Sequence, residues 1–240
     1  MKGKLRNPLK NLTKFEWALW ACSVTAITVS FFAVQSREYL TLVSSLLGVT
    51  SLIFAAKGDA FALMLMICFS SVYATVSYFT RYYGEMIIYL TMQIPTSIVS
   101  LICWLKNPGD KGSAEVKVGK FNKIHVFILI PAAAAITAAF YFILRAFGTA
   151  NLIPSTISVA TSFVALYLMA LRLPAYAAAF ILNDIVLIVL WSLQCAQSIE
   201  YISMVVCFSI FLINDAYTFI CWTKRKRLAA KALQTCKNLD

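Results

Sequence analysis

Eight apolar runs, each about long enough to cross a lipid bilayer as a helix, recur along this 240-residue chain. A transmembrane helix needs roughly 20 consecutive apolar residues to cross the hydrocarbon core. The expected spans are 15–33, 40–56, 60–79, 86–104, 124–144, 153–171, 175–195 and 202–222. The pattern predicts an all-α polytopic membrane protein with about eight transmembrane helices. Only 13% of the residues are charged, about half the share in soluble domains, which argues against a water-soluble enzyme.

The positions of the basic residues predict how the chain crosses the membrane. A formal net charge of +11 could suggest a nucleic-acid partner. Lys and Arg lie between and outside the apolar runs, where membrane topology places them, so no nucleic-acid partner is expected. With eight crossings, eighteen of the 21 basic residues fall on one side, and Arg37, Arg81 and Arg145 fall on the other. The basic side of a membrane protein faces the cytoplasm. Both termini are therefore expected in the cytoplasm.

The chain contains a candidate internal repeat. Segments 102–106 and 220–224 share the pattern Ile-Cys-Trp-x-Lys, and the spans before them match in hydropathy and in their basic ends. We therefore expect a basic N-terminus with an extra, peripheral helix (1–37), a three-helix repeat (38–106), a loop and linker helix (107–150), a second three-helix repeat (151–223) and a basic tail (224–240). The linker helix makes the two repeats parallel, and transporters built this way bind substrate near the membrane midplane between the repeats.

Large polar side chains within the spans indicate where a substrate could bind. Tyr89, Gln93, Thr96 and Ser100 are spaced four, three and four residues apart, so they share one helix face. Amides are costly in hydrocarbon unless they face a cavity or a partner. We therefore expect three amides to face one central cavity, with interhelical hydrogen bonding as the alternative, and four aromatic side chains to be available for stacking. The amides are Gln93, Asn183 and Asn214, and the aromatic residues are Tyr89, Tyr176, Trp191 and Tyr217.

Acidic residues within the spans are further candidates. Asp184 and Asp215 lie inside apolar runs, where a carboxylate is a proton carrier, a substrate ligand or a hydrogen-bonded strut. Glu85 is expected at the outer mouth, in contact with solvent, and His125 at a membrane interface. The sequence has no phosphate-binding loop and no metal-ligand spacing. It has seven cysteines, an odd number, and most of them lie within apolar runs. We therefore expect no enzymatic activity, no cofactor, no metal and no structural disulfide.

Two segments carry a resemblance to a known family. Tyr83-Gly-Glu-Met86, which leads to Tyr89 and Trp104, and Leu182-Asn-Asp-Ile185, which leads to Tyr217 and Trp222, resemble the PnuC family of bacterial vitamin transporters. The resemblance covers about residues 38–225. It implies a SWEET-like fold in the bacterial inner membrane, homotrimers, and facilitated diffusion of nicotinamide riboside or a related nucleoside-like compound. It also implies that a cytoplasmic kinase traps the substrate by phosphorylation.

One motif of the nicotinamide riboside branch is only partly present. The pattern W-x-x-W-x-x-x-N is replaced here by Tyr176, Ala179 and Asn183. A deoxynucleoside and thiamine therefore stay open as substrates, and a proton-coupled carrier using Asp184 or Asp215 stays open as a mechanism. A membrane-embedded enzyme and a non-transporting scaffold are the rivals from other classes. The expected substrate-binding residues are Tyr89, Gln93, Thr96, Tyr176, Asn183, Asp184, Trp191, Asn214 and Tyr217.

Overall fold

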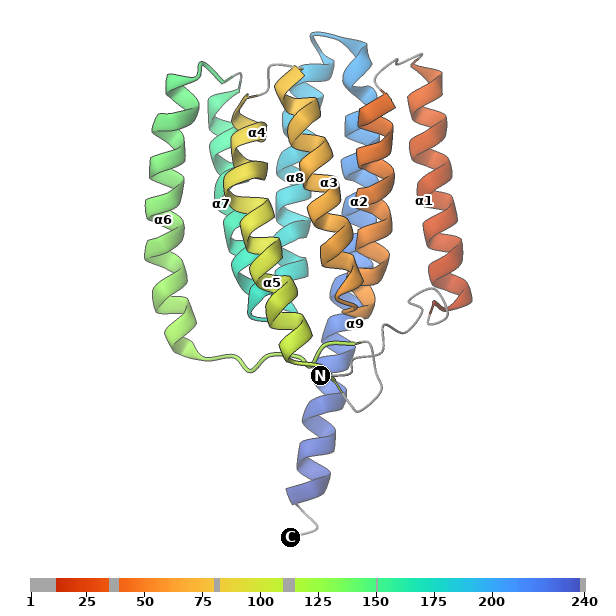
Figure 1. The fold of residues 1–240 in the computed structure, drawn as a ribbon, viewed down its shortest axis with the longest axis vertical. Helices are drawn as coiled ribbons and strands as arrows, with labels where there is room; N and C mark the ends of the chain where they lie inside the picture. The colour runs from red at the N-terminus through yellow and green to blue at the C-terminus, as the bar shows by residue number, and fades with distance from the viewer. Residues whose placement is uncertain (1–11, 35–38, 80–82, 110–114, 150, 238–240) are drawn as a thin grey trace.

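The chain folds into a bundle of long helices standing side by side (Figure 1). The computed structural model describes residues 12–34, 39–79, 83–109, 115–149 and 151–237. Within these ranges eight helical spans are long and apolar enough to cross a membrane, as the sequence predicts. They are α1 (Lys14–Ala33), α2 (Tyr39–Lys57), α3 (Phe61–Phe79), the composite span Tyr83–Lys106, α6 (Lys123–Ala146), α7 (Leu152–Ala170), α8 (Ala175–Cys195) and α9 (Ile202–Lys237).

Two spans differ from a simple α-helix of the expected length. The fourth span consists of α4 (Tyr83–Ile88), a π-helical turn η2 (Tyr89–Gln93) and α5 (Ile94–Lys106). A short 3₁₀ turn, η3 (Ile199–Tyr201), precedes α9. The expected end of the last span at residue 222 is wrong for the helix itself, because α9 continues into the basic tail as far as Lys237. Hydropathy detects where the apolar run ends, and a polar helix in water gives no such pattern.

The central helices bury the core, and two helices lie at opposite edges. α1 packs against α2 and α9, whereas α6 packs against α7 (Figure 1). Most of α6 is accessible and apolar, as in Phe127, Ile130 and Phe142. Apolar side chains facing outward are what a lipid environment accommodates. The bundle interior is therefore formed by α2 to α5 on one side and α7 to α9 on the other.

The lower end of the bundle in Figure 1 is called the basic end here, because Lys57, Lys106, Lys123 and Arg172 lie there. At this end the chain reverses direction between α2 and α3 and between α7 and α8, and the two turns have the same kind of backbone conformation. Gly58 and Arg172 both adopt left-handed backbone conformations, with φ of 64° and 59°. Helices commonly end in such a residue because it lets the next amides bond to the last carbonyls. The two turns occupy corresponding positions in the two halves of the bundle.

Two tryptophans link the halves at the basic end. Trp222 Nε1 donates to the Ala55 carbonyl at 2.9 Å, and Trp104 Nε1 donates to the Met169 carbonyl at 3.2 Å. The two indole rings are buried, with centroids 5.4 Å apart. Each tryptophan thus bonds to the helix that precedes the turn of the other half. This exchange gives the repeated Ile-Cys-Trp-x-Lys pattern a structural role.

The segment after α5 crosses beneath both turns. The backbone N–H of Val116 donates to the Gly58 carbonyl at 2.9 Å, and that of Gly119 donates to the Arg172 carbonyl at 3.0 Å. A side chain at position 119 would collide with the Leu171 carbonyl, so this close approach requires glycine. The segment connecting the two halves in sequence therefore also contacts both of them in space.

Candidate functional site

A small internal cavity lies between the two halves of the bundle. Side chains from α2, α3, α4, η2, α7, α8 and α9 line it, and its volume is about 50 Å³. Small-molecule sites usually measure roughly 300–1,000 Å³. The cavity holds water-sized groups as it stands, so the surrounding helices or side chains must move to admit a larger molecule. A wider hollow between α6 and α7 is open to the exterior and has an almost wholly apolar lining, as a lipid-facing surface does.

The lining combines three kinds of side chain. Its aromatic members are Phe69, Tyr89, Phe180, Phe208 and Phe211. Its acidic members are Glu85, Asp184 and Asp215. Its neutral polar members are Gln93, Ser158, Ser162 and Asn183. Four of the residues expected from the sequence, Tyr89, Gln93, Asn183 and Asp184, therefore meet at this cavity.

Hydroxyl groups of α7 hold the amide of Asn183 in place. Its Oδ1 accepts hydrogen bonds from Thr161 Oγ1 at 2.8 Å and from Ser162 Oγ at 2.9 Å, and a longer one from Ser158 Oγ at 3.4 Å. Three hydroxyl groups from one helix therefore contact the same end of the Asn183 amide. The side chain is fixed by packing and hydrogen bonds before any ligand binds.

Thr96 is not among the lining residues because the helix changes its winding. The Ile94 backbone N–H bonds to the Tyr89 carbonyl, five residues back, where an α-helix would bond four residues back. Pro95, one residue later, has no N–H to restore the α-helical pattern. A π-helical turn inserts one extra residue and so rotates everything after it. The buried residues that follow are consequently Ser97 and Ser100, and Thr96 is only half-buried.

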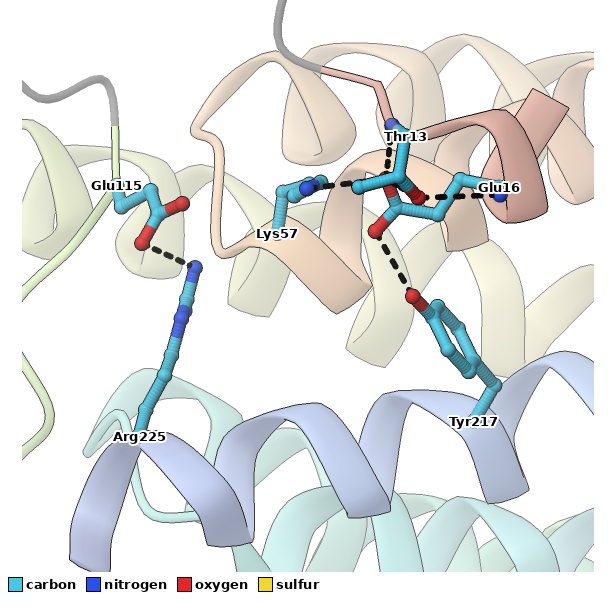
Figure 2. Close-up of polar contacts among 6 residues, drawn as sticks. All are labelled: Thr13, Glu16, Lys57, Glu115, Tyr217 and Arg225. Atoms are coloured by element: carbon cyan, nitrogen blue, oxygen red, sulfur yellow. Dashed lines mark hydrogen bonds and ion pairs between the residues drawn. The ribbon is translucent and has the colours of Figure 1, made fainter. Parts of the chain in front are cut away.

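Asn214 and Tyr217 were expected at the cavity, but both face α1. Asn214 Nδ2 donates to Ser23 Oγ at 3.2 Å and to the Ile210 carbonyl at 2.9 Å. Tyr217 donates its hydroxyl to Glu16 Oε1 at 2.9 Å (Figure 2). Both side chains were expected to need a cavity or a partner within the membrane, and α1 supplies that partner through Ser23 and Glu16.

Tyr176 and Trp191 also lie away from the cavity, one toward each end of α8. Tyr176 is buried beneath the cavity, where its hydroxyl donates to the Ala55 carbonyl at 3.3 Å and its ring meets the edge of Trp222. Trp191 is buried near the opposite end and packs on Tyr201, with centroids 5.7 Å apart. Both side chains belong to packing layers that border the site.

The acidic residues are the largest departure from expectation. Glu85, expected in contact with solvent, is 6% exposed and lines the cavity. Its position near the start of a span suggested a water-facing mouth, but α4 turns this side chain inward. Asp215 lines the cavity too, and its carboxyl group interacts with that of Asp184. The described lining residues include no Lys, Arg or His.

The aromatic wall could not be identified from polarity. Phe69 on α3 contacts Tyr89 and Phe211, with centroid distances of 5.8 and 6.0 Å. Tyr73 extends the cluster, 4.5 Å from Tyr89. Phenylalanines in a membrane span look like ordinary apolar core, so the sequence does not single them out. Phe211 is the exception, because the repeat offset of 118 aligns it with Gln93.

A second polar cluster lies outside the cavity, at the basic end of α1 (Figure 2). Glu16 is 2% exposed and forms an ion pair with Lys57 at 2.9 Å. It also accepts hydrogen bonds from the Thr13 backbone N–H at 2.7 Å and the Thr13 hydroxyl at 2.9 Å. Thr13 in turn caps α1. This cluster attaches the outer helix to α2 and α9.

The described part of the chain includes His, Cys, Asp and Glu side chains, which are common metal ligands. No group of three or more His, Cys, Asp or Glu side chains there is placed to hold a metal ion. The six described cysteines are free thiols. His125 contacts the Tyr167 hydroxyl at 3.2 Å near the basic end of α6. It is not among the residues that line the cavity.

Comparison with known proteins identifies the fold and the family. Residues 38–224 match the family model described as nicotinamide mononucleotide transporter. A curated relative, the nicotinamide riboside transporter PnuC of Neisseria mucosa, is 28% identical over 216 residues, which cover 88% of this chain and 82% of that protein. The crystal structure of the vitamin B3 transporter PnuC superimposes with a TM-score of 0.77 at 27% identity, covering 90% of this chain and 94% of that one. The chain is a multi-pass membrane transporter rather than an enzyme, and it belongs to the nicotinamide mononucleotide transporter family.

Proposed function

We propose that this protein carries nicotinamide riboside across the bacterial inner membrane. The observation that carries the proposal is the cavity between the two halves, which unites an aromatic wall, oriented amides and buried carboxylates. A flat ring stacks on aromatic side chains, at roughly 1–3 kcal/mol per base in nucleic-acid binders. Amide and hydroxyl groups suit the ring carboxamide and the ribose. The curated relative and the solved structure support the same substrate class by their names.

The charge of the cavity favours the riboside over the mononucleotide named in the family description. A phosphate adds a negative charge of about −1.5 to −2 near neutral pH. A phosphate in the cavity would find no counter-charge, because the described lining residues include acidic side chains but no basic one. Phosphorylation inside the cell would therefore prevent return, which is the basis of trapping by a cytoplasmic kinase.

The transport mode proposed is facilitated diffusion. Proton coupling is the second candidate, favoured by the contact between the carboxyl groups of Asp184 and Asp215. Proteoliposomes without kinase separate the two. A uniporter equilibrates radiolabelled nicotinamide riboside and stops, whatever the imposed pH gradient. Accumulation above the external concentration, driven by a proton gradient and lost in Asp184→Asn, would establish coupling and refute uniport.

Substrate identity is tested by calorimetry on the purified protein. Nicotinamide riboside, its mononucleotide, thymidine and thiamine form the panel, because a deoxynucleoside and thiamine are the alternative substrates. We expect binding of the riboside and none of the mononucleotide. Tighter binding of thymidine or thiamine would reassign the substrate. Asn183→Ala serves as the site variant, with Thr75→Ala on the exposed side of α3 as the control.

The orientation and assembly proposed follow from charge and from family resemblance. The basic end faces the cytoplasm, residues 38–106 and 151–223 are the two repeats, and three copies assemble as a homotrimer. Cysteine labelling at Lys117, in the segment beneath both turns, is expected only from the cytoplasmic side. Native mass spectrometry in mild detergent is expected to give three times the 26.7 kDa of one chain.

A further inference from the structure

We propose that Asp184 and Asp215 make this cavity selective for a substrate with a permanent positive charge on an aromatic ring, such as an N-glycosylated pyridinium. The inference rests on the transport function proposed above and adds the property by which the site selects its substrate. Three independent features of the cavity support it: uncompensated acidity, an unpartnered oxygen and a wall of aromatic rings.

The acidity is concentrated and uncompensated. Asp184 and Asp215 are each 3% exposed, come from neighbouring helices α8 and α9, and interact with each other. Two cations at the basic end have other partners, since Lys57 pairs with Glu16 and Arg225 pairs with Glu115. The two carboxyl groups share a hydrogen bond, so one of them holds a proton and the pair carries at most one negative charge, which no described lining residue balances. A bound cation stabilises that charge, whereas a neutral ligand leaves it unbalanced.

One oxygen of Asp184 is positioned to meet a ligand. Its Oδ2 is buried, and it makes no hydrogen bond to any other described group of the protein. A buried carboxylate oxygen without a hydrogen-bond partner is costly. If Asp184 served only to hold the helices together, both of its oxygens would be expected to have partners. The neighbouring Asn183 is tied to hydroxyls of α7, and Asn214 beside Asp215 is tied to Ser23. Asn214 therefore serves the fold, whereas Asn183, Asp184 and Asp215 line the cavity.

The aromatic wall fits the same kind of ligand. Phe69, Tyr89 and Phe211 are packed against one another along one side of the cavity. The faces of aromatic rings carry partial negative charge and attract cations, which is how proteins recognise quaternary ammonium groups. A pyridinium ring would gain both stacking and charge attraction there. An uncharged ring of the same shape would gain stacking alone.

The decisive comparison uses two ligands that differ in charge and little else. Nicotinamide riboside, the charged form, carries an aromatic pyridinium, and benzamide riboside, used as the neutral form, keeps the ribose, the carboxamide and a six-membered aromatic ring without the charge. Calorimetry on the full-length protein is expected to show the charged form binding at least about tenfold more tightly. Equal binding of the two forms would overturn the proposal, and this comparison needs no variant.

Variants then assign the selectivity to residues. Asp184→Asn and Asp215→Asn are expected to weaken binding of the charged form to about that of the neutral form, while binding of the neutral form changes less than about threefold. Glu115→Gln removes a carboxylate that is 46% exposed outside the cavity and is expected to change neither. If both forms lose affinity equally in the aspartate variants, these residues hold the structure or a coupling ion, and the proposal is wrong.

Two further ligands separate this proposal from the choice of riboside. Thiamine carries a cationic thiazolium, and inosine is a neutral nucleoside. If the riboside fails to bind but thiamine binds and is lost in Asp184→Asn, charge selection holds and the proposed substrate is wrong. If inosine binds while neither cation does, charge selection is wrong and a nucleoside transporter remains. Failure of all of these ligands to bind also refutes charge selection.

Discussion

Truncation of Glu16 is expected to loosen α1 from the rest of the bundle. Glu16→Ala leaves the Thr13 backbone N–H and the Tyr217 hydroxyl, which are only partly buried, without their acceptor. Because water reaches both donors in part, each lost hydrogen bond costs about 0.5–1.5 kcal/mol. Lys57 is 20% exposed and can turn toward water, so the lost ion pair adds at most about 1 kcal/mol. The free energy of unfolding should fall by about 1–4 kcal/mol.

Figure 2 offers the matched control for this prediction. Glu115 pairs with Arg225 at 3.0 Å, but its side chain is 46% exposed. Glu115→Ala is therefore expected to cost less than about 1 kcal/mol. Denaturation in detergent, followed by tryptophan fluorescence, measures both variants. If Glu16→Ala unfolds at the same denaturant concentration as Glu115→Ala, the argument from the buried acceptor Glu16 is refuted.

Three further predictions concern the site and the basic end. Asn183→Ala should weaken nicotinamide riboside binding by about tenfold or more, since it removes a pre-oriented amide, and unchanged affinity in calorimetry would remove it from the site. Trp104→Phe deletes the bond to the Met169 carbonyl and should lower the unfolding free energy by about 1–3 kcal/mol, an effect absent if that bond is not formed. Burial raises the pKa of Asp59, which lies between α2 and α3, above its ordinary value, although its bond from the Phe61 N–H opposes this. The stability contributed by protonated Asp59 is fully present below the pKa that Asp59 has in the unfolded chain, and it is lost as the pH rises through its higher pKa in the folded protein. Asp59→Asn should therefore raise the melting temperature at pH 8 relative to the unaltered protein, and the difference should vanish at pH 3.

The spans were predictable because lipid imposes a length and an apolar composition on each helix. Seven predicted spans agree with the helices to within about three residues at each end. The eighth was predicted to end at residue 222, yet α9 runs on to Lys237. Beyond the apolar run helix formation depends on local propensity, which hydropathy does not report.

The site was predictable only where a polar side chain met the cavity without a competing partner. Tyr89, Gln93, Asn183 and Asp184 line the cavity, and where the last two have partners, these come from the helices that form the cavity and not from α1. Thr96 fails because the π-helical turn changes the register, and spacing rules assume a uniform helix. Asn214 and Tyr217 fail because α1 reaches them first. Tertiary contacts of this kind leave no trace in the periodicity of a single helix.

The uninterrupted length of α9 has a consequence for observing transport. One helix carries Asp215 at the cavity and Trp222 at the basic end, and it continues as far as Lys237. The fifteen residues after Trp222 extend about 22 Å beyond it. A rigid rod converts a small tilt inside the bundle into a larger displacement at its tip. A spectroscopic label near Lys231 would therefore act as an external pointer, reporting rearrangements around the substrate without altering a residue of the cavity.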